Sequence, residues 1–340
     1  MTILYYSTCL TRYYILWVYK YLTIVVNTDK VIHMAKNSTP KGDKRRVSYS
    51  QFSNWFKCRH RWYLDHVKGL REFEDSVSTC FGTAMHEAVQ LYIETLYKKS
   101  ATEADTHDLN AIFLSAFDRE LAGKEKGKGV EITPEVHKEY VEDAANIIST
   151  FTNMSNRIKH FPSGKYEFIG VEDEIIMPIK QNIEFVCYID LILKEKATGR
   201  YRIIDIKTST SGWNHYQRDD ESKVAQILLY KAFFSRKYNV DIDMIDVEFF
   251  ILRRKLWENY AFPQSRIQTF IPKNNQPQVA RALNVFADFV TECFTSEGKF
   301  VEDTTVYLKN PGKAKKNCKY CPHKGKNCDA KSDIPKDEED

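Results

Sequence analysis

Two aspartates and a lysine near the middle of the chain have the spacing of a metal-dependent site that cleaves phosphodiesters. Asp190 ends the segment Tyr188-Ile-Asp190, and Asp205-Ile206-Lys207 follows after a short turn. Side chains alternate faces along a strand, so Asp205 and Lys207 should point the same way. Mg²⁺ takes carboxylate oxygens and keeps several waters, and a neighbouring lysine can orient water or stabilise charge on a phosphoryl oxygen. The pattern indicates phosphate-ester hydrolysis, although a D-x-K triplet alone occurs on many solvated strand edges.

Further polar residues lie on segments that must bring them to the same place. His86 lies on an expected helix, where a lone histidine is more often a core or surface residue, but an imidazole can complete a metal site beside carboxylates. Gln226 and Tyr230 are four residues apart, share one helix face, and could hydrogen-bond a DNA strand or its phosphate. Glu174, on the strand before Asp190, could reach the site or be an exposed strand carboxylate.

The cysteines are not arranged like those of a secreted, disulfide-bonded protein. The 8 cysteines are scattered over 340 residues and no export signal is evident. Three of them form the cluster Cys318-x-x-Cys321-x6-Cys328, which is short of one ligand. Zinc could take His323 or a distant cysteine as its fourth ligand, and an iron–sulfur cluster could take Cys58. The residues alone leave both open.

The elements expected from periodicity and turn signals describe an α/β chain. Ser48-x-x-Gln51 has the form of a capping box and opens the first helix. Apolar spacing predicts further helices at 84–96, 107–121, 134–160, 221–238 and 277–294, and strands at 166–169, 174–179, 185–193, 201–207 and 247–252. We interpret the first two strand segments as one bent strand and residues 197–199 as a hairpin turn. The order predicts a mixed β-sheet flanked by helices, with a helical insertion at about 100–165.

Composition and charge set the broad class. The hydrophobic fraction of 43% and the charged fraction of 28% are those of a soluble globular protein, and the net charge of +4 excludes a general polycation. Basic residues instead cluster at 41–46 and 309–328, where they suit a phosphate backbone, although a solvated lysine face is commoner. We predict a DNA-binding, cytoplasmic protein.

The two ends of the chain differ from its middle. The apolar stretch at 13–26 is interrupted by Lys20 and is too short for a confident membrane span. We therefore hypothesise that translation starts at Met34, with a membrane anchor as the alternative. The predicted organisation is an N-terminal extension at 1–46, a main domain at 47–300, a cysteine-rich tail at 301–329 and a disordered acidic tail at 330–340.

Taken in order, these residues resemble the motifs of a known family. Gly82-x-x-x-His86-Glu87, Asp190, Asp205-x-Lys207 and Gln226-x-x-x-Tyr230 look like the PD-(D/E)XK nuclease superfamily. They are most similar to its RecB-like branch, which includes AddAB-type nuclease modules of recombination complexes and CRISPR-associated RecB-like exonucleases. The segment 48–64 also resembles that family's first helix, so the similarity covers about 47–329.

The resemblance implies a fold, an activity and a set of ligands. It implies a restriction-endonuclease-like sheet and DNA cleavage with Mg²⁺ or Mn²⁺, most often exonucleolytic on ends or single strands, in replication, recombination or repair, with a possible helicase or recombination partner. The metal would be bound by His86, Asp190, Asp205 and the carbonyl of Ile206. Lys207 would serve catalysis, and Gln226 and Tyr230 would contact DNA. In the iron–sulfur members a [4Fe–4S] cluster staples the tail to the first helix, here through Cys58, Cys318, Cys321 and Cys328.

Two residues depart from the family pattern. Cys187 stands where glycine is usual, three residues before the first aspartate, and Arg59 follows Cys58 where proline is usual. These changes put the local strand packing and the geometry around Cys58 in doubt, but they remove no catalytic group. The alternative function is a non-catalytic DNA-binding or scaffolding subunit stabilised by an iron–sulfur or zinc cluster. The joint presence of the histidine, both aspartates and Lys207 argues against this alternative, because a protein that had lost catalysis would normally lack at least one of them.

Overall fold

A mixed six-stranded sheet organises the part of the chain that the computed structural model describes, which is residues 44–71, 76–123, 129–259 and 261–333. The strand order is β1-β3-β4-β5-β6, and β2 pairs with β3 outside this path. The β1–β3 and β4–β5 pairs are parallel and the other pairs are antiparallel. The strands are β1 (Arg45–Ser48), β2 (Tyr166–Lys180), β3 (Ile183–Glu195), β4 (Tyr201–Ser209), β5 (Ile245–Arg253) and β6 (Ile267–Phe270).

Strand β3 is the centre of this arrangement because three strands pair with it. β2 runs antiparallel to β3 from end to end. On the other edge of β3, β1 pairs with Ile183 to Val186 and β4 pairs only with Leu191 to Lys194. The β3–β4 ladder therefore ends at the pair Leu191–Ile204, and the two strands separate beyond it. We call this point the fork.

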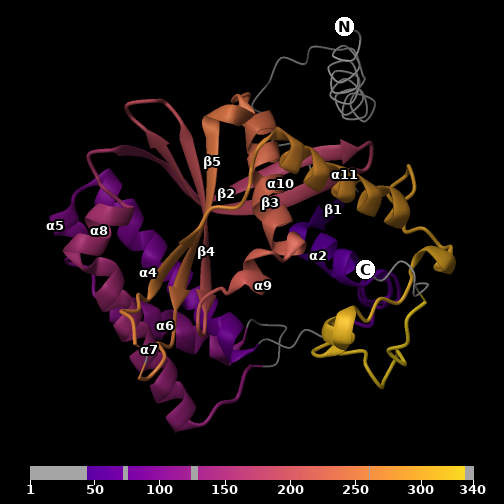
Figure 1. Ribbon diagram of the computed structural model, residues 1–340, viewed down its shortest axis with the longest axis horizontal. Coiled ribbons are helices and arrows are strands. Elements are labelled where there is room, and N and C mark those ends of the chain that lie inside the picture. Colours follow the sequence, from indigo (N-terminus) through magenta and orange to yellow (C-terminus); the bar gives the residue numbers. More distant parts are fainter. Residues whose placement is uncertain (1–43, 72–75, 124–128, 260, 334–340) are drawn as a thin grey trace, which may run out of the picture.

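Helices cover both faces of the sheet (Figure 1). The longer helices at the N-terminal side of the chain are α2 (Tyr49–Lys57), α4 (Val77–Lys98), α6 (Leu109–Ala122) and α7 (Pro134–Thr152), and those after the sheet are α10 (Glu221–Tyr238) and α11 (Gln276–Cys293). Short helices are α3 (Arg59–Trp62), α5 (Ala101–Ala104), α8 (Met154–His160) and α9 (His215–Arg218). A π-helical turn spans Tyr63–Val67, and 3₁₀ turns span Ile242–Met244, Thr304–Val306 and Lys313–Cys318.

Each face of the sheet has its own apolar core. Ile204 and Ile206 of β4 pack with α4, α6 and α7, whereas Ile203 of the same strand packs with α2, α10 and α11. Trp62 is fully buried in the second core and contacts the ring of Phe289 edge-on. Burial on both faces explains the near-continuous apolar run of β5, as expected for a strand paired in parallel in the sheet interior. The predicted α/β architecture is confirmed.

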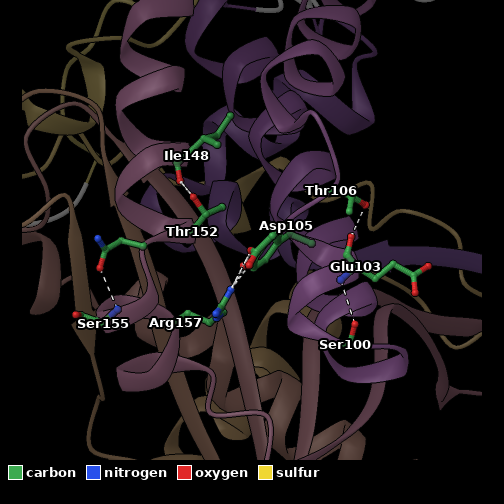
Figure 2. Close-up of polar contacts among 10 residues, drawn as sticks. Ser100, Glu103, Asp105, Thr106, Ile148, Thr152, Ser155 and Arg157 are labelled. Atoms are coloured by element: carbon green, nitrogen blue, oxygen red, sulfur yellow. Dashed lines mark hydrogen bonds and ion pairs between the residues drawn. The ribbon is translucent and has the colours of Figure 1, made fainter.

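The helices α5 to α8 fall between residues 101 and 160, where the sequence indicates a helical insertion. The helix predicted over 134–160 is interrupted at Asn153, whose backbone is not helical and whose side chain caps α8. Arg157 of α8 holds the carboxylate of Asp105 at 2.8 and 2.9 Å (Figure 2). The same guanidinium donates to the Tyr92 hydroxyl of α4 at 2.9 Å, so it ties the insertion to the helix that carries His86.

Most predicted elements are confirmed and a few are wrong. β2 is one strand with a register shift after Phe168, and Gly199 forms the hairpin turn with a φ of +72°. The capping box is wrong, because Ser48 precedes α2 but its side chain makes no capping hydrogen bond and the Gln51 amide donates to the Arg46 carbonyl instead. The short strands β1 and β6 were not predicted.

The predictions for residues 1–33, for a start at Met34 and for the last residues of the acidic tail (334–340) lie outside the described residues. Within the described ranges, no helix has both the length and the apolarity that crossing a membrane requires.

Candidate active site

The two predicted aspartates meet at the fork. Asp190 and Asp205 are the residues immediately beyond the last β3–β4 pair, Leu191–Ile204, so they face each other where the strands separate. The Asp190 carboxylate accepts a hydrogen bond from the Ile206 backbone N–H at 2.7 Å. This side-chain oxygen replaces the backbone acceptor that β3 would supply if the ladder continued. The bond fixes the Asp190 carboxylate at the point where the two strands separate.

Helix α4 brings His86 to the fork because Gly82 lets it approach β4 closely. A Cβ on Gly82 would lie only 3.2 Å from the Thr208 hydroxyl oxygen, so the absence of a side chain allows α4 and β4 to pack closely here. One turn further along α4, His86 Nδ1 lies 3.8 Å from Asp190 Oδ2. The predicted proximity of His86 and Asp190 is therefore confirmed.

Glu172 of β2 completes a group of three possible metal ligands that the sequence did not predict. One ligand atom from each of His86, Glu172 and Asp190 lies within 4.8 Å of the others. Glu174, for which the sequence left open a place at the site or an exposed position on the strand, is exposed and accepts a hydrogen bond from the Tyr188 hydroxyl at 2.8 Å, opposite it on β3. Glu172 has a φ of +49°, and this left-handed conformation costs a non-glycine residue about 1 kcal/mol.

Asp205 and Lys207 form an ion pair on the other branch of the fork. Lys207 Nζ lies 2.7 Å from Asp205 Oδ2, which confirms that these side chains share a face of β4. Asp205 is 1% exposed, and apart from this ion pair neither carboxylate oxygen has a hydrogen-bond partner among the described residues. Burial raises the pKa of Asp205 to about 6. A buried carboxylate with unused lone pairs fits a cation that supplies the missing charge.

The electrostatics of the site also suit a cation. Burial raises the pKa of Asp190 to about 6, although Lys207 and the Ile206 N–H oppose the shift. Burial, and next the charge of Lys207, lowers the pKa of His86, so its imidazole is neutral at pH 7 and free to donate a lone pair. Burial alone would lower the pKa of Lys207, but the carboxylates of Asp205 and Asp190 raise it. Carboxylate oxygens with one imidazole are a donor set for Mg²⁺ or Mn²⁺.

Gln226 and Tyr230 lie beneath the site rather than at its surface. Both are buried on α10, and the Gln226 amide donates to the Tyr230 hydroxyl at 3.0 Å. Burial, followed by the charge of Asp205, raises the pKa of Tyr230, so the tyrosine lies within the electrostatic reach of that carboxylate. The predicted contact of this pair with DNA stays a prediction.

The four predicted cluster cysteines line one pocket, which lies between the α2–α3 turn and the C-terminal segment. Asn310 donates its backbone N–H to Cys58 Sγ, and Ala330 donates to Cys328 Sγ, both at 3.4 Å. The pKa of Cys318 is raised by burial and then by three neighbouring thiols, those of Cys321, Cys58 and Cys328. All four cysteines therefore border the same pocket, but among the described residues the group of ligand atoms that lie within 4.8 Å of one another is the one at the fork, so the thiols are too widely spaced here for a single zinc ion.

His323 is engaged elsewhere in this arrangement. Its Nε2 lies 2.8 Å from Asp65 Oδ1 and its Nδ1 lies 3.3 Å from the Asn327 amide nitrogen. Both ring nitrogens therefore have partners, which does not favour His323 as a zinc ligand. The buried His323–Asp65 contact joins the tail to the π-helical turn, and Asn317 also donates to the Lys57 carbonyl at 2.9 Å.

The two departures from the family pattern fit the structure. Cys187 is buried, and burial raises the pKa of its thiol, so it fills core space on β3 as a small apolar residue. Cys58 is extended and separates α2 from α3, and Arg59 begins α3. Arg59 pairs with Glu292 of α11 at 2.7 Å and covers the Trp55 ring.

The chain matches the model of a known protein family. The family model of the PD-(D/E)XK nuclease superfamily matches residues 46–326. A search of curated proteins finds no significant match to the chain. The matched span contains the fork, the sheet around it and three of the four cysteines of the pocket.

Proposed function

Because this chain belongs to the PD-(D/E)XK nuclease superfamily, we propose that the fork is the active site of a metal-dependent DNA nuclease. The observation that carries the proposal is the convergence of His86, Glu172 and Asp190 beside the buried Asp205–Lys207 pair. The Asp205 carboxylate, which has no hydrogen-bond partner among the described residues apart from its ion pair with Lys207, and the raised pKa values of both aspartates support a site that gains stability when a divalent cation enters.

The side chains of the fork suggest a division of labour. His86, Glu172, Asp190, Asp205 and the Ile206 carbonyl would hold Mg²⁺ or Mn²⁺, which when bound polarises the target phosphate and acidifies water. Lys207 orients the attacking water and offsets negative charge that develops on the phosphoryl oxygens. The Asp205 carboxylate holds this ammonium at 2.7 Å and keeps it protonated, so Lys207 acts as a cation rather than as a base.

We extend the proposal to exonuclease action in DNA replication, recombination or repair. The support is the order of motifs shared with the RecB-like branch, together with a lysine-rich tail whose exposed side chains suit a phosphate backbone. On the same support we propose that the protein works with a helicase or recombination partner. Under this proposal the Gln226–Tyr230 pair lies beneath the metal site, and it contacts DNA only after these two side chains rotate.

The cysteine pocket is proposed to hold a [4Fe–4S] cluster. The pocket is lined by four cysteines, and two of their sulfurs accept backbone N–H bonds of the kind that stabilise thiolates in clusters. The occupied ring of His323 favours the cluster over zinc with a histidine ligand. The cluster would fasten the tail to α2 and α3, next to the hydrogen bonds that His323 makes with Asp65 and Asn317 makes with Lys57.

The test is cleavage of end-labelled single-stranded and duplex DNA by anaerobically purified protein with Mg²⁺, Mn²⁺ or EDTA. We expect metal-dependent cleavage that Asp205→Ala and Lys207→Ala each abolish, while Glu174→Ala on the same sheet retains it. Activity that survives both substitutions would refute the site. Tight DNA binding without cleavage by any metal would favour the alternative, a non-catalytic DNA-binding subunit.

A further inference from the structure

Gln90 is a buried amide that joins the two strands bearing candidate metal ligands. It lies four residues after His86 on α4, so both side chains point from the same helix face toward the fork. Its side-chain nitrogen donates to Glu172 Oε1 at 2.6 Å and to the Asp190 backbone carbonyl at 3.0 Å. One amide group thus fixes the position of β2 relative to β3 beside the proposed metal ligands.

The chemistry of an amide suits this position. A lysine or arginine here would neutralise Glu172 and compete with a cation, whereas a neutral N–H donor stabilises the carboxylate without adding charge. The bond occupies only Oε1 of Glu172, so the second oxygen is available to a metal ion. The same bond holds a residue whose backbone is in the left-handed conformation, a state that persists only when surrounding contacts enforce it.

We propose that Gln90 is a positioning residue that sets the affinity of the fork for its divalent cation. It presets the Glu172 carboxylate and the backbone at Asp190 before the ion arrives, and it takes no part in the chemical step. The inference rests on the proposed function for the identity of the ion, but its physical content is the coupling between Gln90 and Glu172. Loss of a residue that hydrogen-bonds a metal ligand typically weakens metal binding 10- to 100-fold, and we expect the same of the loss of Gln90 at this site.

The experiment measures the dissociation constant for Mn²⁺ on metal-free full-length protein, by titration calorimetry and by the electron paramagnetic resonance signal of free Mn²⁺. Gln90→Met keeps the volume and removes both donors, and we expect it to weaken Mn²⁺ binding at least about tenfold. Cleavage of labelled DNA should then need more Mn²⁺ and return to within about twofold of the wild-type rate at saturation. If Gln90→Met does not fold, Gln90→Asn replaces it in the same measurements. This variant keeps the amide but shortens the side chain, so it should also weaken Mn²⁺ binding.

A matched control is Thr95→Val on the same helix, which removes a buried hydrogen bond to His107 away from the fork. It should lower thermal stability and leave the Mn²⁺ dissociation constant unchanged. A double-mutant cycle with Glu172→Gln isolates the coupling, because Gln90→Met should have little further effect once the Glu172 charge is gone.

Three results would overturn the inference: wild-type Mn²⁺ affinity in Gln90→Met, equal weakening by Thr95→Val, or additive effects of Gln90→Met and Glu172→Gln. A cleavage rate that stays low at saturating Mn²⁺ would also contradict a pure positioning role. Failure of the proposed function looks different, since the wild-type protein would then bind Mn²⁺ at the fork without cleaving DNA, or would not bind it at all.

Discussion

Replacing Asp190 with asparagine should stabilise the protein when divalent cations are removed. Burial raises the pKa of Asp190 from 3.8 to about 6, so its ionised form is disfavoured in the folded state. The difference corresponds to about 3 kcal/mol, at about 1.4 kcal/mol per pH unit. Because the carboxylate is 13% exposed and interacts with Lys207 and Glu172, we expect a measured gain of about 1–3 kcal/mol. Asparagine keeps an oxygen for the Ile206 N–H and leaves Lys207 paired with Asp205.

The pH dependence of this gain follows from the direction of the shift. A carboxyl whose pKa is higher in the folded state binds more protons when folded between about pH 4 and pH 6. The penalty is therefore absent below the unfolded pKa and fully present above the folded one. The stability difference between Asp190→Asn and wild type should be largest near pH 8 and should close as the pH falls toward 4.

Urea unfolding in EDTA at pH 4.5, 6 and 8 measures this difference, with Glu174→Gln as a control carboxylate outside the fork. The control should change the free energy of unfolding by no more than about 0.5 kcal/mol at each pH. Added Mn²⁺ should stabilise the wild type and have a much smaller effect on Asp190→Asn. A variant that is less stable than wild type at pH 8 in EDTA, or a stability difference that does not depend on pH, would show that ionised Asp190 does not destabilise the metal-free fold.

Three other substitutions test the catalytic lysine, the packing of α4 on β4 and the cysteine pocket. Lys207→Met should slow DNA cleavage at saturating Mn²⁺ by about 100-fold or more without weakening Mn²⁺ binding, and a wild-type rate would remove the lysine from the mechanism. Gly82→Leu should lower the free energy of unfolding by about 1–3 kcal/mol, because its side chain must displace Thr208, whereas an unchanged urea midpoint would show that α4 does not depend on this approach. Cys321→Ser should lose iron, visible absorption and soluble yield after anaerobic purification, and wild-type iron content in this variant would exclude the proposed cluster.

The residues predicted from sequence are those whose positions follow from local rules. Alternation along one strand places Asp205 and Lys207 together, and a short hairpin brings Asp190 opposite them. The spacing from Gly82 to His86 is one helical turn, so the close approach of the glycine also positions the histidine. The four cysteines line one pocket because the tail returns to the α2–α3 turn, and the family resemblance rather than any periodicity predicted that long-range contact.

Glu172 and Gln90 could not be found in the same way. Simple alternation gives Glu172 and Glu174 the same face of β2. Only the register of β2 on β3 pairs Glu174 with Tyr188 and sets Glu172 between the pairs Val171–Leu191 and Asp173–Ile189, near Asp190. The left-handed backbone at Glu172 is a local irregularity with no glycine to signal it. Gln90 then looks like a polar interruption of a buried helix face until its two acceptors on other strands are known.

The short strands β1 and β6 escaped prediction for a related reason. Each has four residues, too few to establish alternation, and each is defined by pairing with a longer neighbour. The capping box failed because Ser48 also ends β1, where its hydroxyl contacts Ser50.

Locating the divalent cation in a crystal would show whether the fork is a metal site. Crystals of the full chain grown with Mn²⁺ should show an anomalous scattering peak at the fork, within ligand distance of His86 and Asp190 and adjacent to the Asp205 carboxylate. We expect this peak to disappear in Asp190→Asn at the same Mn²⁺ concentration while the sheet is unchanged. A wild-type fork without a peak at saturating Mn²⁺, or a peak that persists undiminished in the variant, would contradict the proposal that these carboxylates form the metal centre of a nuclease.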